Sequence, residues 1–104
     1  MNSFTDKAIS IIKSIPEGQV MTYGQIARSA GNPHGARQVA RLLHTMSKKH
    51  GLPWHRVINS KGEISLNGEG FETQKYLLEK EGIAFSSNSR INLTFYQYEF
   101  AYSE

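Results

Sequence analysis

Apolar residues recur at helical spacing over the first fifteen positions of the chain. They stand at i, i+4, i+7, i+8 and i+11, and are Phe4, Ala8, Ile11, Ile12 and Ile15. This is the pattern of a helix with one buried face. It predicts a helix over residues 4–14, which Ser3 is placed to cap. The Pro-Glu-Gly segment at 16–18 then predicts a turn.

Two further helices are predicted by the signals at their ends. Thr22 and Gln25 have the spacing of a capping box, so a helix is expected to start after Thr22. Gly31 suits the left-handed position that ends such a helix. The next helix is expected to be capped by Asn32 and to run to about Ser47. Its predicted inward face consists of Ala36, Val39, Ala40 and Leu43. Two short helices joined by a tight turn are typical of a helix-turn-helix.

The second half of the chain predicts a small β hairpin and one more helix. Residues 56–58 and 63–65 flank a turn-forming segment at 59–62, which indicates a hairpin, or wing. A Gly-containing loop over 66–70 is expected to lead into a helix over 71–81, which Gly82 ends. The tail is expected to be a strand or an extended segment, because it is aromatic and partly alternating through Ile91, Leu93, Phe95, Tyr96, Tyr98, Phe100 and Tyr102.

Charge is unevenly distributed along the chain. The formal net charge is +3, but residues 18–62 contain seven Lys or Arg, all four histidines and no Asp or Glu. From Glu63 onward, the chain contains seven acidic residues and three basic residues. An acid-free basic segment in a small domain suits a polyanion such as nucleic acid, although a solvated face without a partner would have the same composition.

Composition limits the number of domains and the kinds of functional site that the chain can have. A chain of 104 residues fits one domain over 1–104. The chain has no cysteine, which excludes disulfides, thiolate metal sites and a thiol nucleophile. The histidines lack metal-ligand spacing, so no metal and no cofactor is expected. No segment approaches the ~20 apolar residues of a membrane span, and no signal peptide is evident. We expect a soluble monomer in the cytoplasm, nucleoid-associated in a bacterium or nuclear in a eukaryote.

The most distinctive segment is Pro53-Trp54-His55-Arg56-Val57. It resembles the Pro-Cys-His-Arg-Val active-site motif of the O6-alkylguanine-DNA alkyltransferases, in which the cysteine accepts the alkyl group. Matching blocks occur in the same order over about residues 20–82, at 22–27, 31–33, 36–37 and 81–82. Trp54 cannot replace the cysteine, because the lone pair of the indole nitrogen belongs to the aromatic ring. The chain is therefore similar to the alkyltransferase-like proteins, which bind the lesion and hand it on.

The resemblance implies a mainly α fold with a small β hairpin, a single winged helix-turn-helix domain of the alkyltransferase C-terminal type. It makes Arg37 the finger that enters the duplex, with small Ala36 beside it close to the minor groove. It places Tyr23 at the phosphate beside the target nucleotide, which it helps to rotate outward. Further DNA contacts are expected at Thr22, Gln38 and Arg41. Taken alone, Arg37 could also be an ordinary phosphate contact, and Tyr23 a half-buried core residue.

By the same resemblance, Trp54 and Tyr23 lie at a base pocket. There the indole can pack against a flipped purine, although a single tryptophan is more often a core residue. In the methyltransferases the loop beside the base supplies a tyrosine and small residues. The matching positions here are Asn67, Gly68 and Glu69. This departure predicts altered contacts to the O6 position and a roomier pocket.

His55 and Glu81 match the histidine that helps to ionise the cysteine and the glutamate that orients it. Without a thiol this pair has nothing to activate, so we interpret it as a retained scaffold, together with Pro53 and Val57. Arg56 is expected to hold the motif loop by hydrogen bonds to carbonyl groups.

Three functions are open at this stage. The resemblance favours a non-enzymatic sensor that flips O6-alkylguanine out of double-stranded DNA and flags it for nucleotide excision repair proteins of the UvrA or UvrC type. An active alkyltransferase would need His55 or Glu81 as acceptor, and both are poor nucleophiles without strong activation. A winged-helix regulator would bind undamaged DNA instead.

Overall fold

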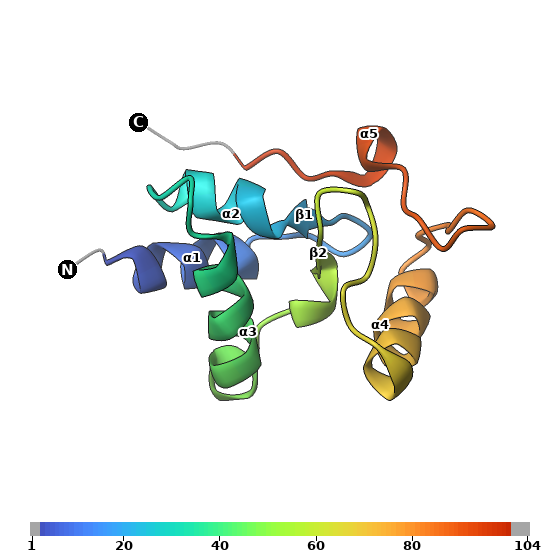
Figure 1. The fold of residues 1–104 in the computed structure, drawn as a ribbon, viewed down its shortest axis with the longest axis horizontal. Helices are drawn as coiled ribbons and strands as arrows, with labels where there is room; N and C mark the ends of the chain where they lie inside the picture. The colour runs from blue at the N-terminus through green and yellow to red at the C-terminus, as the bar shows by residue number, and fades with distance from the viewer. Residues whose placement is uncertain (1–2, 101–104) are drawn as a thin grey trace.

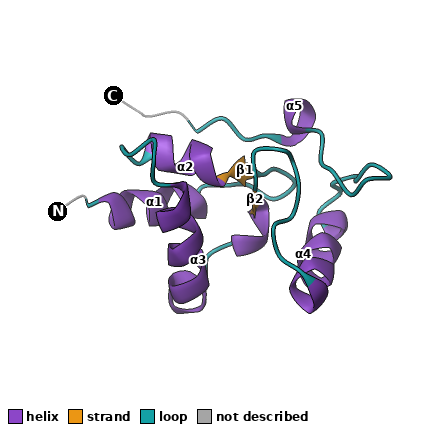
Figure 2. Cartoon of the chain, viewed as in Figure 1, coloured by secondary structure: helices purple, strands orange, loops and turns teal. Residues whose placement is uncertain are grey.

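The computed structural model describes residues 3–100. The described part of the chain is mainly helical, with one short pair of strands at its centre (Figures 1 and 2). In chain order the elements are α1 (Phe4–Lys13), β1 (Met21–Thr22), α2 (Tyr23–Ser29), α3 (Ala36–His50), the 3-10 turn η1 (Trp54–Arg56), β2 (Val57–Ile58), α4 (Gly68–Lys80) and α5 (Leu93–Tyr96). Helices α1 to α3 lie on one side of the strands and α4 lies on the other (Figure 1).

The ends of the first two helices follow the sequence signals. The Ser3 hydroxyl accepts a hydrogen bond from the Asp6 amide at 3.1 Å, which caps α1. The capping box of α2 is complete, because the Gln25 amide donates to the Thr22 hydroxyl at 3.1 Å and the Thr22 amide donates to the Gln25 side chain at 3.2 Å. Gly31 follows α2 in the left-handed region, with φ +99°. These local predictions are confirmed.

The start and the inward face of α3 differ from the prediction. Asn32 does not cap the helix; its side chain accepts from the His34 amide at 3.1 Å and donates to Gln38 at 3.0 Å, so it stabilises the turn before α3. The helix begins at Ala36 and continues past Ser47 to His50. Its buried residues are Val39, Leu42 and Leu43. Ala40 is exposed, whereas Leu42, which the prediction left outside the inward face, is buried.

The predicted hairpin is replaced by a parallel strand pair. β2 pairs with β1, with Met21 opposite Val57 and Thr22 opposite Ile58. The chain does reverse at 59–62, where the Asn59 amide donates to the Glu63 carbonyl at 3.0 Å. Residues 64 and 65 form no strand; beyond the turn, Glu63 forms an isolated antiparallel bridge with Arg90. The Ile91 amide donates to the Gly62 carbonyl at 2.8 Å, and a Cβ at position 62 would collide with the Ile91 carbonyl.

The last helix and the tail also depart from expectation. α4 begins at Gly68, so the predicted loop over 66–70 is shorter than expected. The tail contains the helical turn α5, and beyond it an extended segment lies along β1, where the Tyr98 amide donates to the Val20 carbonyl at 2.8 Å. The extended part of the prediction is therefore confirmed. Tyr102 lies outside the described residues.

The core has two parts, which meet at the strands. The larger part packs α1, α2 and α3 together around fully buried Ile12, Met21 and Ile26. The smaller part joins the strands to α4 and the tail through Val20, Ile58, Leu78, Ile83 and Ile91. The strand pair is thus held from both sides. Among the helices of residues 3–100, none has the length and apolar character to span a bilayer.

Candidate nucleic-acid interface

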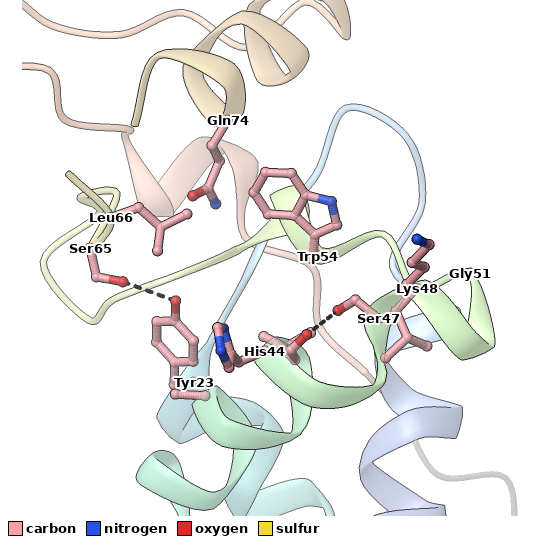
Figure 3. Close-up of a pocket in the computed structure, with 12 residues that line it drawn as sticks. Tyr23, His44, Ser47, Lys48, Gly51, Trp54, Ser65, Leu66 and Gln74 are labelled. Atoms are coloured by element: carbon pink, nitrogen blue, oxygen red, sulfur yellow. Dashed lines mark hydrogen bonds between the residues drawn. The ribbon is translucent and has the colours of Figure 1, made fainter. Parts of the chain in front are cut away.

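A cavity of about 630 Å³ opens between α3, η1 and the segment before α4 (Figure 3). Its volume falls in the range of small-molecule sites, roughly 300–1,000 Å³. The residues that line it are Tyr23, Ala40, Leu43, His44, Ser47, Lys48, Gly51, Leu52, Trp54, Ser65, Leu66 and Gln74. The motif position that distinguishes this sequence is therefore on the wall of this cavity.

The turn η1 presents Trp54 to this cavity. Gly51 ends α3 in the left-handed conformation, with φ +60°, and the Trp54 amide then donates to the Leu52 carbonyl at 2.8 Å. The indole is half-buried, packs against the larger core and also lines the cavity. Trp54 is therefore both a core residue and a residue of the cavity wall.

Tyr23 forms the facing side of the cavity. It is the first residue of α2 and follows β1 directly, and its hydroxyl shares a hydrogen bond of 3.0 Å with the Ser65 hydroxyl (Figure 3). Trp54 stands three residues before Val57, which pairs with Met21 in the parallel ladder. The strand pair therefore sets the separation of the two aromatic walls.

Glu81 joins the motif to two other segments. Its carboxylate accepts hydrogen bonds from His55 Nε2 at 2.7 Å, from Arg56 Nη2 at 2.8 Å and from the Gly18 amide at 2.9 Å. Burial by itself would raise the pKa of Glu81, but the hydrogen bonds from Arg56, Gly18 and His55 outweigh it and lower the pKa to about 2. The predicted His55–Glu81 pair is confirmed, and the carboxylate is fully ionised at neutral pH.

Arg56 and Gln74 fix the backbone of the motif. Arg56 Nη1 donates to the Ile15 carbonyl at 2.9 Å, as expected for a residue that holds the loop through carbonyl groups. Its bonds to Glu81 were not expected. Gln74, which sequence reasoning missed, donates to the carbonyls of His55 and Val57, both at 3.0 Å. A signal was present, because Gln74, Leu78 and Glu81 share one face of α4 at i, i+4 and i+7.

The remaining scaffold residues lie where the motif requires them. Pro53 precedes η1, and its carbonyl accepts from the Arg56 amide at 3.0 Å. Val57 is 1% exposed and belongs to β2. Neither side chain carries a polar group, and the two residues flank the turn that carries Trp54.

Three predicted pocket residues lie elsewhere. Asn67 precedes α4, and Gly68 and Glu69 occupy its first turn, where all three are exposed and none is among the residues that line the cavity. The early start of α4 explains this, because it carries these positions away from the cavity. Ser65 and Leu66 take their place, and Leu66 is 42% exposed.

A basic stripe runs along the exposed face of α3 to the mouth of the cavity. It consists of Arg37, Arg41, His44 and Lys48, which are spaced i, i+4, i+7 and i+11. The last two also line the cavity. Within residues 3–100, the Arg37 and Arg41 side chains form no ion pair, so both are available to a polyanion.

Three residues that were predicted to contact DNA are partly buried or engaged within the protein. Ala36 is half-buried at the start of α3 beside Arg37. The Gln38 side chain accepts a hydrogen bond from Asn32. Thr22 is 6% exposed and caps α2 with its hydroxyl, so it has little surface left for direct contact with DNA. Thr22 instead places Tyr23. In the described part of the chain, no three His, Asp or Glu side chains cluster to hold a metal ion.

Helices α2 and α3, which pack together as the predicted helix-turn-helix, define with the motif turn and the cavity a DNA-binding domain of the alkyltransferase type. The chain belongs to the family of the DNA-binding domain of 6-O-methylguanine DNA methyltransferases, whose model matches residues 3–83. The resemblance inferred from the motif blocks and the fold class that it implied are confirmed, apart from the hairpin.

Curated relatives share most of the length of the chain. A DNA base-flipping protein of Vibrio parahaemolyticus is 43% identical, over 95% of this chain and 99% of that protein. A DNA base-flipping protein of Escherichia coli is 40% identical, over 95% of this chain and 77% of that protein. The Schizosaccharomyces pombe protein named Alkyltransferase-like protein 1 is 39% identical, over 95% of this chain and 97% of that protein.

The solved structures agree with this placement. The crystal structure of S. pombe Atl1 in complex with damaged DNA containing O6-carboxymethylguanine superposes with a TM-score of 0.80 at 39% identity, covering 95% of this chain and 97% of that one. A structure of Mycobacterium tuberculosis O6-methylguanine methyltransferase superposes with a TM-score of 0.62 at 30% identity, over 75% of this chain and 47% of that one.

Proposed function

We propose that this protein binds double-stranded DNA containing O6-alkylguanine, extrudes the modified base and holds it in the cavity beside Trp54 without transferring the alkyl group. One observation carries the proposal: the residue in the position of the alkyl-accepting cysteine is an aromatic wall of a cavity of about 630 Å³, which opens at the end of a basic helix.

Two arginines of the basic stripe on α3 support the binding step. Arg37 and Arg41 are exposed and unpaired among the described residues, and phosphate contacts from such cations supply most non-specific affinity for DNA. Extruding a base costs a few kcal/mol. We assign to Arg37 the filling of the gap in the duplex, since a planar guanidinium can both stack and donate hydrogen bonds. Stacking on Trp54 would return roughly 1–3 kcal/mol.

The surroundings of His55 and Glu81 support binding without chemistry. A carboxylate with a pKa of about 2, already accepting bonds from Arg56, Gly18 and His55, is a weak nucleophile. The His55 nitrogen nearest to it is engaged in the same cluster. With no cysteine in the chain, no other side chain at the motif offers an acceptor for an alkyl group.

A protein that holds a lesion without repairing it requires a repair system that acts afterwards. We assign this step to nucleotide excision repair proteins of the UvrA or UvrC type, with the protein acting as a monomer in the cytoplasm.

Fluorescence of Trp54, the single tryptophan, tests the proposal. Titration with matched duplexes that contain guanine or O6-methylguanine should give a change that saturates at a much lower concentration of the modified duplex. In parallel, stoichiometric protein is incubated with duplex labelled on the O6-methyl group, and no label should move to protein. Label on the protein, or equal binding of both duplexes, would overturn the proposal.

A further inference from the structure

Lys48 is the only permanently charged residue among the twelve that line the cavity. No Asp or Glu lines it, so nothing in the wall offsets this positive charge. Within residues 3–100, Lys48 forms no ion pair: the three recorded pairs are His55–Glu81, Arg56–Glu81 and Arg90–Glu63. The ammonium group therefore lacks a protein partner on the side from which a ligand would enter.

Apart from His44 and Lys48, the side chains with hydroxyl or amide groups that line the cavity are already engaged in hydrogen bonds. The Gln74 amide donates to two backbone carbonyls, and the Ser47 hydroxyl donates to the Leu43 carbonyl at 2.6 Å. The Tyr23 and Ser65 hydroxyls bond to each other. A neutral alkyl group would find apolar contacts here, from Leu43, Leu52, Leu66 and Trp54. It would gain nothing from Lys48.

The position of Lys48 distinguishes it from the other cations of the stripe. It stands eleven residues beyond Arg37, about 16 Å along the helix axis. Figure 3 places its side chain on the far side of Trp54 from Tyr23, where α3 approaches the motif turn. A cation at the end of a flexible four-carbon stem can reach a charged group held against the indole.

We propose that Lys48 is a specificity-determining residue, which makes the cavity favour O6 adducts that carry a carboxylate over neutral adducts of the same size. This inference rests on the proposed function, because it concerns what the same cavity holds. Lys48 then acts on the adduct, whereas Arg37 and Arg41 act on the DNA.

Binding to three duplexes, identical except at one guanine, tests the inference. They carry guanine, O6-carboxymethylguanine, or its uncharged amide O6-carbamoylmethylguanine, which has nearly the same shape. The wild-type protein should bind the carboxymethyl duplex about three- to tenfold more tightly than the amide duplex, as expected for one partly desolvated ion pair. In Lys48→Gln this preference should disappear, while affinity for the amide duplex stays within about twofold.

Lys49→Gln is the matched control, because Lys49 is an exposed lysine on the same turn of α3 that does not line the cavity. It should keep the preference. Equal wild-type affinity for the two adducts would overturn the inference, and so would an equal loss on all three duplexes in Lys48→Gln, which would make Lys48 a phosphate contact. Should the wild-type protein bind both adducts no better than guanine, the proposed function itself would fail.

Discussion

Under the proposed function, Arg37 acts outside the domain and Trp54 acts inside it. Arg37 is exposed at the first turn of α3 and has no ion-pair partner in the described part of the chain. Trp54 is half-buried and lines the cavity. If a base leaves the stack, Arg37 would contact the gap in the duplex and Trp54 would contact the extruded base.

Replacing Arg37 tests this division. Arg37→Ala should weaken binding to an O6-methylguanine duplex by about tenfold or more, because a contact inside the duplex is desolvated, and to an undamaged duplex by only a few-fold. Both affinities are measured by fluorescence anisotropy at one salt concentration, since salt changes every phosphate contact. Arg41→Ala, one turn further along α3, should weaken both duplexes alike. An equal loss on both duplexes in Arg37→Ala would instead favour a regulator of undamaged DNA.

At the scale of elements, predictions from sequence succeeded where the signal is local. The Thr22–Gln25 capping box and the left-handed Gly31 depend on residues a few positions apart, and both were predicted. The start of α4 was missed because Gly68 and Gly70 disfavour helix, and the packing of Leu66 against Gly70 is not visible in the sequence. The β1–β2 pair was missed because two-residue strands carry no periodicity.

The features of the site also separate into those that the sequence predicts and those that depend on the long-range fold. The His55–Glu81 pair and the place of Trp54 were predicted from the motif blocks, because each residue of these blocks can be matched to a position in the family. The lining by Ser65 and Leu66, in place of Asn67, Gly68 and Glu69, depends on where α4 begins, a long-range property. Lys48 and His44 could have been found from the spacing of the basic stripe.

Helix α4 supports the motif turn through one buried amide. Gln74→Met should lower the free energy of unfolding by about 1–3 kcal/mol, because the carbonyls of His55 and Val57 lose a donor in a buried place. Urea unfolding measures this loss. Glu72→Gln, an exposed change on the same helix, should stay within about 0.5 kcal/mol. A Gln74→Met protein as stable as the wild type would show that these two hydrogen bonds do not hold the turn.

At the scale of the whole molecule, Glu81 connects segments that are distant in sequence. It bonds to the Gly18 amide before β1, to His55 and Arg56 in the motif turn, and it ends α4 itself. The stability of the fold should therefore depend on its ionisation. Since the pKa falls from 4.5 to about 2 on folding, this contribution is fully present above pH 4.5 and is lost as the pH falls toward 2.

The size of this dependence gives a further prediction. The shift corresponds to at most about 3 kcal/mol between pH 4.5 and 2. Glu81→Gln should be less stable at pH 7 and should lose less stability over that interval than the wild type, as followed by urea unfolding at a series of pH values. Glu79→Gln, two residues away and exposed, should keep the wild-type profile. A profile for Glu81→Gln as steep as that of the wild type would refute the assignment.

The parallel strand pair has a consequence for the range of lesions that can be held. Tyr23 follows one strand directly and Trp54 lies three residues before Val57 of the other, so the ladder holds the backbones of these two walls close together. The third wall, at Ser65 and Leu66, belongs to no strand and meets Tyr23 through a single hydroxyl contact. The cavity therefore has two walls that adjoin the strand pair, Tyr23 and Trp54, and a third wall at Ser65 and Leu66 that no strand holds. Substitutions at 65 and 66 should therefore change the size of adduct that the cavity accepts while the strand pair stays in place.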